Sequence, residues 1–183
     1  SQKRAQSRRA IKQQKWEEIH NEPSDDEFVF ASPNMVGKHN RKLVFLGNLK
    51  QETSSADNIY CHGLNTVNKN FLNYPYFTGT ADHVNTIGVH DVLYQLSNLI
   101  VRNASKFKYL RDRIMNVHSR KFDENCIVTV GYFEINFKRS LELNTVYTVK
   151  IDDLKYTDHV KYAFVIEVTV RIIQHDIEAT HAK

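Results

Sequence analysis

The chain has 183 residues, of which 41% are hydrophobic and 25% are charged, with a formal net charge of +4. This composition fits one folded domain with a sizeable core and excludes an intrinsically disordered chain. No apolar run approaches the roughly 18 residues that a membrane helix needs, and the first residues lack the apolar core of a secretory signal. Cysteine occurs only twice and without a Cys-x-x-Cys pair, so neither a disulfide framework nor a zinc ribbon is expected. We therefore expect a cytoplasmic protein without membrane contact.

Residues 1–38 are predicted to form a charged arm ahead of a body at residues 39–183. Residues 1–15 carry six basic side chains and no acid, whereas residues 16–28 carry six acids and no Lys or Arg. A basic arm can attract nucleic acid by neutralising phosphates, here through residues 3–15. The acidic block competes with phosphate, so we favour a solvated helix whose charges pair with that block or with a partner subunit.

Two strands are predicted at the start of the body. They are LVFLGNL (43–49) and NIYCHGLNTV (58–67), joined by the polar turn QETSSAD.

The clearest helix in the chain follows, with Thr86 or Asn85 as its N-cap. Its apolar residues recur every three or four positions: Val89, Val92, Leu93, Leu96, Leu99 and Ile100. The opposite, polar side carries Asp91, Tyr94, Gln95 and Asn98. A shorter helix is expected within residues 106–122, with Leu110, Ile114 and Val117 facing inward.

The remainder of the chain changes to a period of two, which is typical of strands. In CIVTVGYFEINFK (126–138) the apolar residues move from even to odd positions after Gly131, which indicates a bulge or a bend. Further strands are predicted at TVYTVKI (145–151), VKYAFVIEVTVRI (160–172) and IEATH (177–181).

This order of elements predicts an α+β fold. Strands, one long central helix and then several long antiparallel strands suggest a sheet curled around that helix. This is the plan of the hotdog fold, a long antiparallel sheet wrapped around one central helix.

The stretch HVNTIGVHDVLYQL (83–96) resembles the corresponding stretch of the FcoT-type hotdog thioesterases, which act on long-chain acyl-CoA. The shared features are a His-x-Asn at His83 and Asn85, small and apolar residues at 86–87, and the Gln-Leu pair at 95–96. Weaker similarity upstream includes Gly63–Leu64 and Thr78–Gly79, and about residues 40–181 are compatible with the family.

The resemblance implies that Asn85 is catalytic and that an upstream tyrosine, Tyr76 or Tyr74, assists it. The family also carries an Asn just before the Gln-Leu pair, where this chain has Tyr94. A tyrosine cannot offer the paired donor and acceptor of an amide, so the exact reaction stays open between hydrolysis and another thioester reaction, such as addition to an enoyl thioester. By the same resemblance we expect a homo-oligomer.

The residues themselves suit thioester chemistry. The unpaired N–H groups at the helix start, around Gly88 and Val89, offer donors and a positive dipole end for charge that grows on a carbonyl oxygen. Gly88 would let a substrate approach the backbone. Asn85 would orient water or the carbonyl, and His83 or Asp91 would act as general base.

Each of these residues also has a purely structural interpretation. Asn85 is then only the N-cap, His83 a structural histidine and Asp91 part of a solvated helix face. Tyr74 and Tyr76 either pack in a loop or line an acyl tunnel. His62, His90 and His118 do not have a metal-binding spacing, and we expect neither a metal nor another cofactor.

Three classes of function are compatible with these sequence features. We favour an enzyme that acts on fatty acyl-CoA or acyl-carrier-protein thioesters, with substrate contacts at Tyr74, Gly88, Val89, Tyr94 and Gln95. The basic side chains of residues 106–113 either hold the nucleotide phosphates or form a wet helix face. The alternatives are a regulator that senses acyl-CoA and uses the arm on DNA, and a structural protein of viral type.

Overall fold

The computed structural model describes residues 28–52, 58–66, 83–114, 129–157 and 165–183. Within these residues the chain forms one antiparallel sheet of six strands in the order β1-β2-β4-β5-β6-β3. The strands are β1 (Lys50–Gln51), β2 (Ile59–Gly63), β3 (Ile135–Phe137), β4 (Tyr147–Thr157), β5 (Val165–Gln174) and β6 (Ile177–Ala182). The helices are α2 (Thr86–Arg102), α3 (Lys108–Ile114) and two short 3-10 helices, η2 (Pro33–Val36) and η3 (Arg41–Leu43). The predicted α+β class is confirmed.

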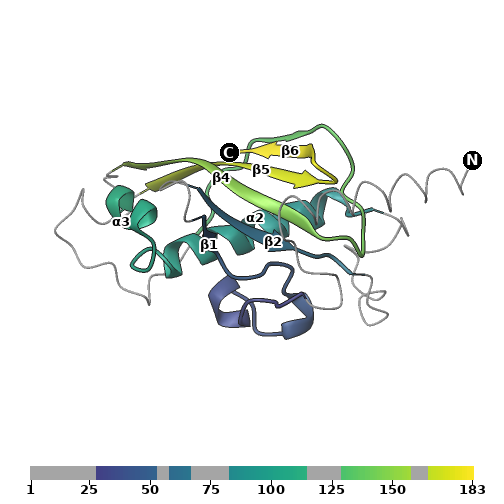
Figure 1. Cartoon of the computed structure of the whole chain (residues 1–183), viewed down its shortest axis with the longest axis horizontal. Coiled ribbons are helices and arrows are strands. Elements are labelled where there is room, and N and C mark those ends of the chain that lie inside the picture. Colours follow the sequence, from purple (N-terminus) through teal and green to yellow (C-terminus); the bar gives the residue numbers. More distant parts are fainter. Residues whose placement is uncertain (1–27, 53–57, 67–82, 115–128, 158–164) are drawn as a thin grey trace, which may run out of the picture.

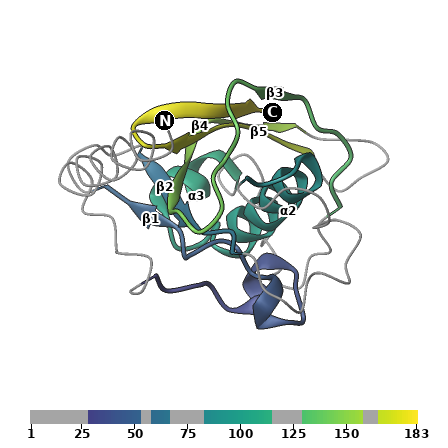
Figure 2. The same ribbon diagram turned by 90° about the vertical axis from the view of Figure 1, so that its right-hand side faces the viewer.

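The elements form three layers, with α2 in the middle. Figures 1 and 2 show the sheet on one side of α2 and the segment that holds η2 and η3 on the other. No helix in the described part of the chain is long and apolar enough to cross a membrane.

The core lies between α2 and the sheet. All six residues of the predicted apolar face of α2 are buried, which confirms the periodicity of the helix. The strand residues that complete the core lie opposite one another across the ladders, since Ile59 pairs with Ile151 and Cys61 with Val149. Because paired residues share a face, this register gives the sheet one continuous apolar surface. In α3 the predicted inward residues Leu110 and Ile114 are buried as well, whereas Val117 lies outside the described residues.

The polar side of α2 is also covered, which the sequence did not indicate. Gln95 and Asn98 are buried, at 0% and 2% exposure, on the side where η2 packs against the helix. Their amides are satisfied by backbone groups: Gln95 Nε2 donates to Leu43 O and Asn98 Nδ2 to Tyr94 O. A helix can therefore bury this side without an energetic penalty for unpaired polar groups.

The strand predicted at 43–49 does not form as a continuous strand. Residues 45–47 make isolated bridges and backbone hydrogen bonds to residues 30–31 and 62–64. Leu43, however, belongs to η3, and the first strand begins at Lys50. Gln95 supplies the reason, because its side chain bonds both the carbonyl of Leu43 and the N–H of Phe45 and so replaces a strand ladder there. Residues 28–38 pack on the body rather than standing apart from it, since Ala31 and Val36 are part of the core.

The C-terminal strands follow the predictions more closely. β4 contains residues 147–151 of the strand predicted at 145–151, and β6 contains all of the strand predicted at 177–181. β5 contains residues 165–172 of the strand predicted at 160–172, whose first five residues lie outside the described residues. The described part of the 126–138 run is a strand only at Ile135–Phe137. β5 and β6 are joined by a tight two-residue turn at His175 and Asp176, whose φ angles are 54° and 61°. Two successive positive φ values match the twist of the flanking strands, as in type I′ hairpins.

Candidate functional site

The start of α2 is fixed by Asn85, the predicted N-cap. Its backbone is extended, its side-chain Oδ1 accepts a hydrogen bond from Gly88 N–H at 2.8 Å, and its carbonyl oxygen accepts one from Val89 N–H. The capping part of the prediction is confirmed. The free donors of the helix start therefore lie at Thr86 and Ile87, whose N–H groups have no partner within the described residues, rather than at Gly88 and Val89.

Gly88 and Val89 are both buried. A Cβ added at Gly88 would lie 2.7 Å from Val84 Cγ1 and 3.3 Å from Asn85 Oδ1. Real Cβ atoms essentially never approach another atom as closely as 2.7 Å, so the glycine lets the first turn of α2 pack on Val84. The same position is 3.9 Å from the side-chain nitrogen of Asn65.

Asn65, just after β2, brings a buried amide to the start of α2. The residue is 1% exposed, its Oδ1 accepts a hydrogen bond of 2.5 Å from the hydroxyl of Tyr147, and its carbonyl accepts one from Asn144 N–H. Its Nδ2 is buried and has no hydrogen-bond partner within the described residues. Nearly every buried polar group in a folded protein is paired, so this donor requires an explanation.

Tyr147 is the anchor of that amide. It is fully buried, and burial is the main cause that raises its pKa well above 10, with smaller contributions from Cys61 and from the charge of Asp91. The phenol is therefore neutral at ordinary pH and donates its proton to Asn65 Oδ1. No local motif in the sequence marks Asn65 or Tyr147 as a site residue.

Residues 141–145, which lie between β3 and β4 in the chain, contact the segment just before α2. This segment runs antiparallel to residues 83–84: Val84 N–H donates to Leu141 O at 2.7 Å, and His83 forms an isolated bridge with Glu142. Two residues later, Asn144 donates to Asn65. The segment therefore joins the candidate histidine His83 to the backbone of Asn65.

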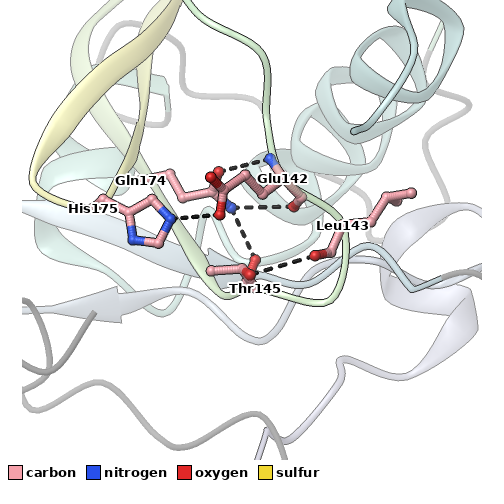
Figure 3. A network of polar contacts seen from close by, with 5 residues as sticks. All are labelled: Glu142, Leu143, Thr145, Gln174 and His175. Carbon is pink, nitrogen blue, oxygen red and sulfur yellow. Dashed lines mark hydrogen bonds and ion pairs between the residues drawn. The ribbon is translucent and has the colours of Figure 1, made fainter. Parts of the chain in front are cut away.

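The side chain of Gln174 holds this segment in place (Figure 3). Its Oε1 accepts a hydrogen bond from Glu142 N–H at 2.8 Å, and its Nε2 donates to the carbonyls of Thr145 and Glu142 at 3.0 and 3.3 Å. Gln174 is buried, so these bonds are shielded from water.

A histidine–carboxylate pair stands beside the same network. His175 Nε2 lies 2.7 Å from Glu142 Oε2, and the two side chains are 11% and 21% exposed. Figure 3 shows the imidazole of His175 pointing from the β5–β6 turn toward the Glu142 carboxylate. Neither residue was predicted from the sequence as part of a site. The one available signal was the His-Asp pair between two alternating runs, which places a histidine on a hairpin turn.

Three other predicted site residues, Asp91, Tyr94 and Gln95, lie together on the side of α2 that η2 covers. Asp91 forms an ion pair of 2.6 Å with Lys38 and accepts a hydrogen bond from Gln95 at 3.2 Å. The ammonium of Lys38 also lies 5.5 Å from the ring centre of Tyr94. The carboxylate of Asp91 and the amide of Gln95 are thus engaged by the protein itself. Neither is brought together with Glu142 and His175 by a contact that the structure describes.

Tyr74 and Tyr76 lie outside the described residues. Among the residues that the structure does describe, no group of three or more His, Cys, Asp or Glu side chains is arranged to hold a metal ion.

No protein-family model matches the chain, and a search of curated proteins finds no match.

Proposed function

We propose that the protein is an acyl-thioester-processing enzyme with a hotdog fold, which hydrolyses fatty acyl-CoA or acyl-carrier-protein thioesters and works as a homo-oligomer. Two features support this proposal. The antiparallel sheet covers one long helix, as in that fold, and polar groups from three distant parts of the chain meet at the start of the helix.

The unpaired amide nitrogen of Asn65 is the observation that carries the proposal. Leaving a buried donor without a partner costs about 1–3 kcal/mol, so a bound acceptor at this donor would recover free energy. This donor lies beside the first turn of α2, where the free N–H groups and the helix dipole favour negative charge. An acyl carbonyl oxygen that becomes negative during reaction has the chemistry that this arrangement would stabilise.

The reaction follows from that placement. When water attacks the carbonyl carbon of a thioester, charge moves to the carbonyl oxygen, and Asn65 Nδ2 donates to it. One such preorganised donor is worth about 10²–10³ in rate. Departure of the thiolate then gives a carboxylic acid and a free thiol.

The surface of α3 supports a nucleotide-bearing carrier. In that helix Lys108 pairs with Asp112 and Arg113 stacks on the ring of Tyr109, whereas Arg111, and Lys106 just before the helix, are exposed. Exposed cations of this kind suit the phosphates of CoA or an acidic carrier protein.

The test is release of free thiol from a panel of acyl-CoAs of rising chain length. Asn65→Asp keeps the oxygen that accepts from Tyr147 but removes the N–H₂ donor, so we expect turnover to fall by at least about 10²-fold. Tyr147→Phe keeps the donor, and its loss of turnover should be clearly smaller. Circular dichroism and the unfolding midpoint establish that both variants are folded.

Asn85 is tested with a matched pair in the same assay. Asn85→Asp keeps an acceptor for the N–H of Gly88, while Asn85→Ala removes it. Equal loss of turnover in both variants assigns a role to the amide nitrogen, as the family resemblance implies. Full turnover in Asn85→Asp would leave Asn85 as a cap alone. Absence of thiol release by the unmodified protein from every acyl-CoA would overturn the proposed function.

A further inference from the structure

The His175–Glu142 pair lies at the same end of α2 as the proposed thioester site. Residues paired across an antiparallel bridge have Cβ atoms about 4.5–5.5 Å apart, so the bridge places the Glu142 side chain beside that of His83. His83 precedes the cap Asn85 by two positions. Asn144, two residues after Glu142, donates its backbone N–H to the carbonyl oxygen of Asn65. Backbone contacts therefore connect the pair to the residues just before α2 and to Asn65.

The hydrogen bonds of the imidazole leave one nitrogen available. Nε2 is engaged by Glu142 at 2.7 Å, and Nδ1 has no partner within the described residues. A neutral ring that donates from Nε2 to a carboxylate carries its lone pair on Nδ1, which makes that atom a proton acceptor. The carboxylate stabilises the imidazolium that forms when Nδ1 takes up a proton.

The backbone that carries this carboxylate is held firmly. The backbone of Glu142 is fixed from one side by the bridge to His83 and from the other by Gln174, which bonds both its N–H and its carbonyl. A base that is held by an orienting partner, which is held in turn by the fold, has the arrangement that activated bases in enzymes share. The ring of His175 is 11% exposed, so water reaches it only in part.

We propose that His175, oriented by Glu142, is the general base of the thioester reaction; this inference rests on the proposed function. Nδ1 removes a proton from a water molecule while the water oxygen forms a bond to the carbonyl carbon. The carbon–sulfur bond then breaks with its electron pair on sulfur, and the thiolate takes the proton back from the imidazolium. One thioester and one water thus become one carboxylic acid and one thiol, with no other reactant.

The experiment is chemical rescue in the thiol-release assay. His175→Gly removes the imidazole without straining the backbone, because glycine accepts the positive φ of this position. We expect kcat to fall by about 10²–10⁴ with a much smaller change in KM. Added imidazole should restore a large part of kcat in this variant and should not affect the unmodified protein.

Two variants separate a role in proton transfer from a role in structure. Asp176→Gly is the matched control, since it truncates the neighbouring residue of the same turn at a similar φ, and it should keep full turnover without a response to imidazole. Glu142→Gln should lower kcat by about tenfold or more without rescue, because the orienting carboxylate, not the base, is lost. If His175→Gly does not fold, His175→Asn takes its place, since asparagine tolerates the same backbone conformation.

The outcomes distinguish this inference from the proposed function. Turnover by the unmodified protein together with unchanged kcat in folded His175→Gly or His175→Asn overturns the role of His175 alone. A fall in kcat that imidazole does not reverse, with an equal fall in Asp176→Gly, also overturns it, because the turn would then act only through structure. Absence of turnover by the unmodified protein overturns the proposed function and the inference with it.

Discussion

At the scale of single residues, Gly88 is where packing and the site are most closely linked. Its missing side chain lets Val84 approach the first turn of α2, next to the cap oxygen of Asn85 and the amide of Asn65. Alanine is a better helix former than glycine by about 1 kcal/mol, so on an isolated helix the substitution to alanine would stabilise. Here the added methyl group has no space, and packing decides the sign.

We predict that Gly88→Ala lowers the free energy of unfolding by about 1–3 kcal/mol. In a Val84→Ala background the colliding methyl group is gone, so the same substitution should cost little or should stabilise. Guanidinium unfolding of the four proteins gives the coupling energy, which we expect to be at least about 1 kcal/mol. An equal cost of Gly88→Ala in both backgrounds would contradict this explanation.

At the scale of secondary-structure elements, the amide of Gln95 joins α2 to the segment that covers it. It accepts from Phe45 N–H at 2.9 Å and donates to Leu43 O at 2.8 Å, and the residue has no exposed surface. The side chain thus replaces two backbone hydrogen bonds that a strand at 43–49 would have made with a neighbouring strand.

We expect Gln95→Leu to lower the free energy of unfolding by at least about 2 kcal/mol, because it leaves one N–H and one carbonyl buried without partners. Ser97→Ala is the control on the same helix. Its hydroxyl bonds only the carbonyl of Leu93, which keeps its place in the helix, so the change should stay below about 1 kcal/mol. Urea denaturation measures both, and a Gln95→Leu protein as stable as the control would show that the tether contributes little.

The same element shows how far the sequence predicts this structure. The apolar stripe and the cap of α2 were predictable because both depend on residues three or four positions apart. The burial of Gln95 was not, since its partners lie about fifty residues away and a glutamine on a helix is usually solvated. The candidate site follows the same rule. The cap at Asn85 was predictable from local spacing, whereas Tyr147 meets Asn65 across 82 residues and His175 meets Glu142 across 33.

At the scale of the whole molecule, the buried Cys61 thiol and Tyr147 hydroxyl make the free energy of unfolding fall as the pH rises into the alkaline range. Burial raises the pKa of the Cys61 thiol to about 12 and the pKa of the Tyr147 hydroxyl well above 10. In the unfolded chain the thiol ionises near pH 8.5 and the hydroxyl near pH 10. The unfolded state therefore releases these protons first as the pH rises, and the folded state loses stability.

We predict a constant contribution from Cys61 below about pH 8 and a decline above about pH 9 that continues toward pH 12. The slope from this thiol approaches about 1.4 kcal/mol per pH unit. Cys61→Ala has no thiol to ionise, so its stability should fall less steeply between pH 9 and 10.5. Unfolding midpoints of both proteins at half-unit steps of pH test this, and parallel curves would contradict the assignment.

The tethers of the proposed site also bear on when it can form. Asn65 is anchored by Tyr147 far along the chain, Glu142 by His175 and Gln174, and each contact closes a long loop. Loop closure must be paid for in chain entropy before such contacts stabilise anything, and chains rich in distant contacts fold slowly. A growing polypeptide cannot hold Glu142 in place until the β5–β6 turn has been made. The start of α2 thus depends on local contacts, whereas the proposed site is complete only after the last strands have formed.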